Sequence, residues 1–169
     1  MKISIGSKFI DGPYGGGNLF VKNLRNYFLE NGHKVIHDLS EKDIDIIILM
    51  NPLIDSEQST FDDNDINFYQ KYINPNAISV QRINECDERK NTSHVNKSIV
   101  RSNKHIDYTI YVSKWIQEIY KKLGLKEDDS TVILGGANQK YFNLVDKSFW
   151  EGNYPIKLVT HHWSGNWMK

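Results

Sequence analysis

The sequence predicts an α/β domain in which a doubly wound, mostly parallel β-sheet carries helices on both faces. Three observations support this fold class. Segments with the period-2 alternation of strands alternate along the chain with segments whose apolar residues recur at helical spacing. Residues 46–50 form an unbroken apolar run, which is typical of a strand buried on both faces of a parallel sheet. A glycine-rich turn at residues 12–18 follows the first strand-like segment.

The first three strands are predicted over residues 2–6, 33–36 and 44–50. Between the first two, a helix has its apolar face formed by Leu19, Phe20, Val21, Leu24 and Phe28. Asn31 and Gly32 supply a left-handed C-cap for this helix. Pro52 ends the third strand. This order places the glycine-rich turn at the carboxyl end of the first strand.

The next helix is predicted to open with a capping box in which Thr60 is the N-cap and Asp63 replaces the usual Glu. Its apolar stripe is Ile66, Tyr69 and Ile73, and Pro75 ends it. Residues 77–83 predict the fourth strand.

A further helix is predicted to begin near Thr92 or Ser93 and to bury Val95, Ile99 and Ile106. Residues 108–112 predict the fifth strand, and Ser113 is a good N-cap for the helix after it, which ends at Gly124. Residues 131–134 and 156–160 predict two more strands. We therefore expect a first domain over residues 1–150, followed at 151–169 by a linker and the first strand of a second, truncated domain.

Composition excludes several functional classes. The chain has 169 residues, enough for one well-buried domain, and its 21 Lys and Arg residues balance 21 Asp and Glu residues. A net charge of zero argues against a nucleic-acid partner. No apolar run approaches the roughly 20 residues of a membrane-spanning helix. A single cysteine, Cys86, excludes an intramolecular disulfide and suits a reducing compartment, so we expect a cytoplasmic protein, in solution or at the membrane surface.

The first candidate site is the glycine-rich turn with Gly15, Gly16, Gly17 and Asn18. Glycines let a ligand approach the backbone, and the N–H groups at the start of the following helix favour an anion. The spacing matches neither the dinucleotide-binding fingerprint nor the Walker P-loop. The competing interpretation is a turn whose glycines serve backbone geometry alone.

The second candidate site is the polar segment that follows the fourth strand. Arg82, Asn84, Glu85 and Asp87 lie at another carboxyl strand end and could face the same cleft as the glycines. The competing interpretation is a solvated loop with internal ion pairs. Cys86, in the same segment, is expected to be a small buried hydrophobe rather than a nucleophile.

In order and spacing, the motifs resemble the amino-terminal half of retaining GT-B fold glycosyltransferases of group 1, also called GT4. Residues 15–35 look like the glycine loop, first helix and Gly-His-x-Val strand of that class, and residues 111–113 look like its Val-Ser helix start. Residues 132–142 look like its Ile-x-Asn-Gly-Val-Asp segment, with Gly135 in place of Asn and Asn138 in place of Asp. Residues 157–169 look like the first strand and phosphate loop of the second domain, and Lys169 matches the lysine of that loop.

The resemblance implies a Rossmann-like domain that transfers a sugar from a nucleotide-sugar donor to a glycan, lipid or small-molecule acceptor. The glycine loop would face the donor phosphates and the acceptor, the strand end at Arg82, Asn84 and Glu85 would face the cleft, and Lys169 would belong to the second phosphate loop. The family needs no divalent metal or other cofactor. On this reading the chain is a fragment that is inactive alone. A non-catalytic sugar- or nucleotide-binding module, or a pseudo-enzyme subunit, is the alternative, and a dehydrogenase-type domain that binds NAD is a third.

Overall fold

The computed structural model describes residues 1–12, 15–52, 58–137, 143–145 and 149–155. The chain forms two compact units, Met1–Leu134 and Gly135–Lys169. Every helix and strand of the described residues belongs to the first unit. In the second unit, the Trp150 indole N–H donates to the Tyr154 carbonyl oxygen at 2.7 Å. The strand predicted at 156–160 and Lys169 lie outside the described residues, and the domain boundary at residue 150 stays a prediction.

The sheet is Rossmann-like, with six parallel strands in the order β2-β1-β3-β4-β5-β6, which confirms the predicted fold class. The strands are β1 (Lys2–Ile5), β2 (Lys34–Ile36), β3 (Ile46–Leu49), β4 (Ile78–Ile83), β5 (Tyr108–Tyr111) and β6 (Ser130–Val132). Since all strands run the same way, their carboxyl ends meet at one edge of the sheet. Ligands of open α/β sheets bind at this edge.

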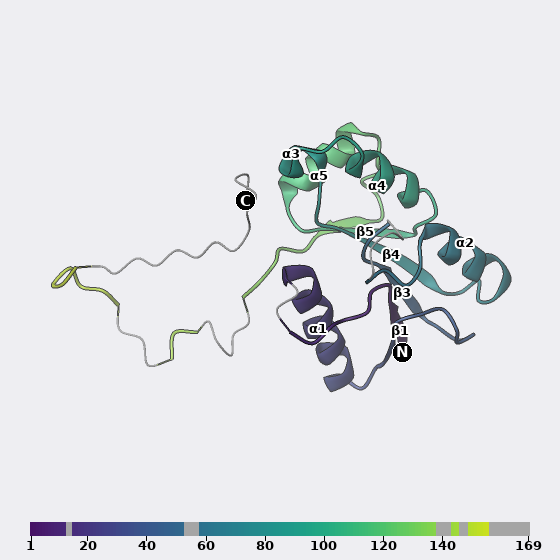
Figure 1. Ribbon diagram of the computed structural model, residues 1–169, viewed down its shortest axis with the longest axis horizontal. Helices are drawn as coiled ribbons and strands as arrows, with labels where there is room; N and C mark the ends of the chain where they lie inside the picture. The colour runs from purple at the N-terminus through teal and green to yellow at the C-terminus, as the bar shows by residue number, and fades with distance from the viewer. Residues whose placement is uncertain (13–14, 53–57, 138–142, 146–148, 156–169) are drawn as a thin grey trace. The chain divides into compact units, whose positions relative to one another are not determined.

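Helices cover both faces of the sheet (Figure 1). They are α1 (Gly15–Glu30), α2 (Asp63–Tyr72), α3 (Asp87–Lys90), α4 (Val95–Asn103) and α5 (Lys114–Lys122). The chain steps from β1 to β2 in one direction along the sheet and from β3 to β6 in the other. Because βαβ crossovers are right-handed, α1 lies on one face and the later helices lie on the opposite face.

The core has one layer on each side of the sheet. On the α1 side, Val21 packs with Ile3, Ile5 and Ile48. The other side holds two clusters. The cluster under α2 is formed by Ile44, Ile47, Leu49, Phe61, Ile66, Tyr69 and Ala77. The cluster under α4 and α5 is formed by Ile83, Cys86, Val95, Ile99, Tyr111, Ile116, Tyr120 and Leu125. The β3 strand is thus buried on both faces, as its apolar run predicts.

The apolar face of α1 differs from the prediction at Leu19 and at Phe20, whose ring stacks on Arg82 and is not in the core cluster under α1. Val21 is buried, and Leu24 and Phe28 pack against its cluster, but Leu19 is 56% exposed. With 3.6 residues per turn, Leu19 lies about 200° around the helix from Val21, so both cannot face the sheet. The prediction that Leu19 faces the core was wrong.

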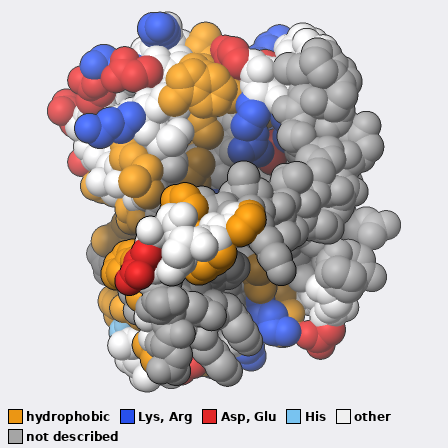
Figure 2. Space-filling model, turned by 90° about the vertical axis from the view of Figure 1, so that its left-hand side faces the viewer, with side chains coloured by type: hydrophobic (Ala, Val, Ile, Leu, Met, Phe, Trp, Pro, Cys, Tyr) orange, Lys and Arg blue, Asp and Glu red, His pale blue; other side chains and the backbone are white. Residues whose placement is uncertain are grey.

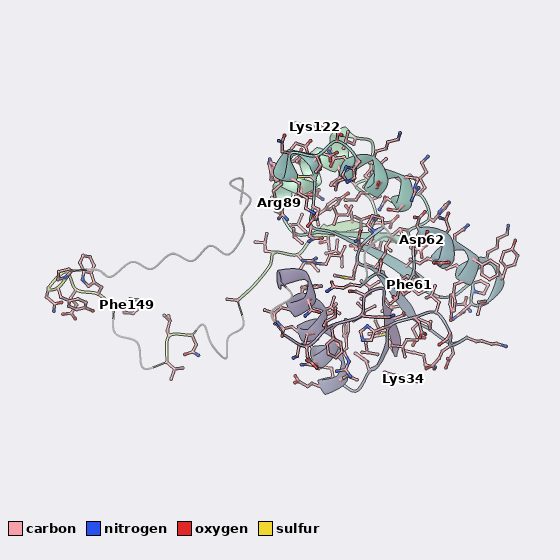
Figure 3. The ribbon with its side chains drawn as sticks, viewed as in Figure 1. Lys34, Phe61, Asp62, Arg89, Lys122 and Phe149 are labelled. Atoms are coloured by element: carbon pink, nitrogen blue, oxygen red, sulfur yellow. The ribbon has the colours of Figure 1, made fainter. Side chains whose placement is uncertain are left out.

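The capping box of α2 lies two residues later than predicted. Asp62, not Thr60, is the N-cap: its carboxylate accepts from the Asn64 and Asp65 N–H groups, and the Asp65 carboxylate accepts from the Asp62 N–H. Asp63 is buried, with His105 Nδ1 at 3.3 Å, and so cannot cap. Figure 3 labels Asp62 beside Phe61, whose ring is buried in the core.

The segment before β5 also differs from the prediction. The α4 helix ends at Asn103, whose side-chain amide donates to Gln81 Oε1 and Thr109 Oγ1, both at 2.8 Å. Ile106 therefore lies beyond the helix, where it packs against the cluster under α2. The short helix α3 occupies part of the segment expected to be a loop. Among the described residues, no helix is long and apolar enough to cross a membrane.

Candidate functional site

A pocket of about 290 Å³ lies where β1, β3 and β4 end, within the first unit. Gly6 and Ser7 follow β1, Met50 follows β3, and Arg82 lies near the end of β4. The lining residues are Gly6, Ser7, Gly17, Val21, Met50, Asn51, Pro52, Gln58, Ser59, Gln81, Arg82, Asn84, Glu85, Lys90, Val95, Ser98 and Ile99. The two candidate sites of the sequence therefore contribute to one pocket.

The glycines form the start of α1. Gly15 begins the helix with a φ of +85°, a conformation that favours glycine. A Cβ atom added at Gly16 or Gly17 would meet no atom within 4 Å. Packing against the described residues therefore does not require glycine at positions 16 and 17. Gly17 lines the pocket, and the helix start offers N–H donors suited to an anion.

Asn18 does not face the pocket. Its side chain is 4% exposed and makes two hydrogen bonds to the backbone of Ile10: Nδ2 donates to the carbonyl oxygen at 2.7 Å, and Oδ1 accepts from the N–H at 2.8 Å. This pairing fixes the loop after β1 against α1. Asn18 is thus engaged with the backbone and is not among the residues that line the pocket, and its predicted role in the ligand loop stays a prediction.

Arg82 brings a cation into the pocket from β4. Its guanidinium lies 3.8 Å from the centre of the Phe20 ring, at a distance typical of cation–π stacking. Burial lowers the pKa of Arg82, against a smaller opposing effect from the charge of Glu85. Within the described part of the chain, the Arg82 guanidinium forms no hydrogen bond or ion pair. The Arg82 guanidinium is thus a partly desolvated cation that stacks on the Phe20 ring.

Glu85 and Asn84 also line the pocket, as expected, but Glu85 is engaged with its neighbours. Its carboxylate pairs with Lys90 and lies 3.5 Å from the Arg89 guanidinium. The expectation of internal ion pairs thus holds for Glu85, while Arg82 and Asn84 face the pocket as the functional interpretation requires. Arg89 lies on α3 and is labelled in Figure 3.

The Asp87 side chain stabilises the segment between β4 and α4 and does not line the pocket. Its carboxylate accepts hydrogen bonds from the N–H groups of Val95 and Asn96 and from the Thr92 hydroxyl. The buried Tyr120 hydroxyl donates to the Glu85 carbonyl oxygen at 2.8 Å, and burial is the main cause of its raised pKa. The Asp87 and Tyr120 contacts fix the segment from β4 to α4 in one conformation. Cys86 is fully buried, as predicted.

Sequence reasoning missed the wall formed by the loops after β1 and before α2. Ser7 and Ser59 pair as an isolated antiparallel bridge, and the Lys8 N–H donates to the Gln58 carbonyl oxygen at 2.8 Å. A Cβ atom on Gly6 would lie 2.7 Å from the Phe61 ring, so only glycine fits there. In the sequence, the only sign of this wall is that Gly6 ends the alternation of polar and apolar residues in the first strand.

The charges around the pocket are mixed. On the described atoms of the face in Figure 2, hydrophobic side chains lie among basic and acidic ones, without a continuous basic stripe. No group of three or more His, Cys, Asp or Glu side chains among the described residues could hold one metal ion. The prediction that the protein uses no metal or other cofactor stays a prediction.

No protein-family profile matches this chain. No curated protein sequence matches it either. Among solved structures, an α-glucosyltransferase with UDP-glucose and DNA containing an abasic site has 15% identity and a TM-score of 0.48, over 78% of this chain and 41% of that one. An α-glucosyltransferase with UDP and DNA containing an A:G mismatch has 19% identity and a TM-score of 0.42, over 68% of this chain and 37% of that one. Another α-glucosyltransferase, with UDP, has 17% identity and a TM-score of 0.44, over 78% of this chain and 43% of that one.

This chain therefore spans between 37% and 43% of the length of those structures. At such identities and TM-scores, the likeness carries no conclusion about the activity of this chain. Two of the three contain DNA, whereas we expect no nucleic-acid partner for this chain, and that expectation stays a prediction.

Proposed function

We propose that this chain is the acceptor-side half of a retaining GT-B glycosyltransferase, which transfers a sugar from a nucleotide-sugar donor. One observation carries the proposal: Gly17, at the start of α1, and Arg82, Asn84 and Glu85, at the end of β4, line the same pocket at the carboxyl edge of a parallel sheet. The glycine helix start would stabilise negative charge on the departing diphosphate through N–H groups that are already in place.

The chemistry of the pocket agrees with this role. Among the described residues that line it, Glu85 is the sole carboxylate, and it is paired with Lys90. The described lining residues thus supply no free carboxylate as a general base. A retaining transferase of the proposed class uses the donor phosphate itself as the base, so the protein would position the reactants and stabilise charge.

The alternative, a binding module without catalysis, fits the same described residues. Such a module would bind a sugar or nucleotide in this pocket, and no combination of donor and acceptor would give a product. Binding and transfer must therefore be measured separately.

The test begins with binding of nucleotide sugars to the chain. We expect UDP-glucose, or another donor in a panel of nucleotide sugars, to shift the backbone amide resonances of Gly15, Gly16 and Gly17. In Gly16→Trp the bulky side chain fills the space before the helix, so this response should disappear while the fold is kept. Leu19→Trp is the matched control, because Leu19 is an exposed residue of the same helix.

An unchanged response of Gly16→Trp would contradict the proposed donor loop. If the chain is combined with the donor-binding half and product forms, the binding-module alternative fails. Efficient transfer by these residues alone would contradict the proposal that they are one half of the catalytic apparatus.

A further inference from the structure

Among the described residues that line the pocket, cations outnumber anions by one. Of its charged lining residues, Arg82 and Lys90 are cationic and Glu85 is anionic. Glu85 pairs with Lys90, and it also lies near Arg89, which is not among the lining residues. Among the described residues Arg82 forms no ion pair of its own, and Glu85, whose charge acts on it, is already paired with Lys90.

The Arg82 side chain is also held in place before any ligand arrives. Phe20, on α1, stacks on the guanidinium at 3.8 Å, while the β4 backbone of Arg82 pairs in register with Ile110 of β5. A guanidinium fixed in this way keeps its planar fork of N–H donors, which matches the two oxygens of a phosphate or carboxylate. A partly desolvated cation gains most when such an oxyanion completes its hydrogen bonds.

The size of the pocket limits the size of the ligand that could carry this phosphate or carboxylate group. Its volume of about 290 Å³ lies at the lower end of the range of roughly 300–1,000 Å³ that holds drug-sized ligands. Apolar walls from Val21, Met50 and Ile99 alternate with the polar groups of Asn84 and Ser98. This combination suits one sugar-sized molecule better than an extended glycan or a lipid chain.

We propose that the pocket binds a small acceptor of monosaccharide size that carries a phosphate or carboxylate group, and that Arg82 selects the acceptor by binding this group. The assignment to the acceptor, rather than to the donor, rests on the proposed function. It narrows the acceptor from any glycan, lipid or small molecule to a small, negatively charged one.

The test uses the 169-residue chain and four probes: inorganic phosphate, glucose 6-phosphate, glucose and UDP. Binding is measured by calorimetry and by the side-chain Nε resonance of Arg82. We expect inorganic phosphate and glucose 6-phosphate to shift this resonance and glucose to leave it unchanged. Glucose 6-phosphate should still bind when UDP is present, because the two anions would occupy different places.

Arg82→Gln should weaken binding of glucose 6-phosphate by at least about tenfold, since it removes a charged hydrogen-bond partner. Arg82→Lys should recover only part of the loss, because lysine keeps the charge but not the planar fork. Arg25→Gln is the matched control. Arg25 also lies over a phenylalanine ring, 5.2 Å from the centre of Phe9, but it is not among the residues that line the pocket.

Three outcomes would overturn the inference. The first is an Arg82 resonance that inorganic phosphate and glucose 6-phosphate leave unchanged. The second is equal binding of glucose 6-phosphate by Arg82→Gln and Arg25→Gln. The third is displacement of glucose 6-phosphate from Arg82 by UDP, which would assign the site to the donor. These outcomes are distinguishable from failure of the proposed function. That function is tested by the amide resonances of Gly15, Gly16 and Gly17 in the presence of a nucleotide sugar.

Discussion

The ring of Phe20 lies under the guanidinium of Arg82, with 3.8 Å between the guanidinium carbon and the ring centre. This contact joins the second turn of α1 to the end of β4, two elements that are far apart in the sequence. It also links the two candidate sites, because Phe20 follows the glycines and Arg82 begins the polar segment. Residues from the two candidate sites are therefore in direct contact.

Replacement of Phe20 by leucine should weaken oxyanion binding without removing it. Loss of the stacked ring frees the Arg82 side chain, and a cation–π contact contributes about 0.5–2 kcal/mol, so the affinity should fall by about twofold to thirtyfold. Titration with glucose 6-phosphate measures the change. Phe9→Leu, which removes the ring near Arg25, is the control, and an equal loss in both variants would show that the Phe20 contact has no special role.

Gly6→Ala should destabilise the fold, whereas Gly16→Ala should not. The new Cβ at position 6 would lie 2.7 Å from the Phe61 ring, and overpacking of this kind costs about 1–3 kcal/mol. Position 16 has open space, and alanine favours helix over glycine. Urea unfolding compares the two variants. Phe61→Leu should partly rescue Gly6→Ala, and a loss that is purely additive would contradict the proposed clash.

Asp62→Ala should lower the free energy of unfolding by about 1 kcal/mol, because it removes the carboxylate oxygen that accepts from the Asn64 and Asp65 N–H groups. Asp62→Asn should keep most of the stability, since its side-chain oxygen can still accept from the helix N–H groups. Thermal unfolding gives the comparison. If Thr60→Ala proved as damaging as Asp62→Ala, the observed position of the capping box would be contradicted.

Asp87 should make stability depend on pH on the acid side. Burial alone would raise the pKa of Asp87, but hydrogen bonds from Thr92, Asn96 and Val95 outweigh it and lower the pKa below its ordinary value of 3.8. The carboxylate therefore contributes its full stability above the unfolded pKa and loses it as pH falls through the lower folded pKa.

Asp87→Asn should consequently be less stable at pH 7 and should lose less on acidification than the unmodified chain. Urea unfolding at pH 7 and near pH 3 measures both effects. Asp128→Asn, at an exposed position, serves as the control. The same acid dependence in Asp87→Asn and the unmodified chain would show that Asp87 is not the group that titrates.

Cys86 should resist thiol reagents in the folded protein. Its side chain is fully buried, and burial is the main cause of the raised pKa of the thiol, so little thiolate is available. An aromatic disulfide reagent should react fully in urea and hardly at all in buffer. Equally fast labelling in both conditions would contradict the buried position.

The sheet was predictable because its signals are local and repeated. The apolar run of β3 and the N-cap Ser113, whose hydroxyl accepts from the Ile116 N–H at 3.2 Å, need no knowledge of distant residues. Parallel order then follows from the alternation of strands and helices, and it brings Gly17 and Arg82 to the same edge.

What the sequence could not show were the partners of polar side chains. Asn18 follows three glycines and suits a ligand loop equally well, until its pairing with the Ile10 backbone is known. Asp63 and Asp62 are both plausible members of a capping box, and contact with His105 decides between them. Asp87 and Arg82 are both charged residues after or near a strand end, but only Arg82 lines the pocket. Such differences arise from contacts between segments distant in the chain.

The bridge between Ser7 and Ser59 has a consequence for how the pocket can change during evolution. Main-chain pairing joins these two loops, and the Ser59 hydroxyl also donates to the Asn51 carbonyl oxygen at 3.3 Å. Substitutions that preserve this main-chain pairing would keep the spacing of the wall, so the rim can vary in chemistry while keeping its shape. A change in the length of either loop would shift the pairing and alter the aperture itself. New ligand preferences at this rim should therefore arise by substitution, and new ligand sizes by insertion or deletion.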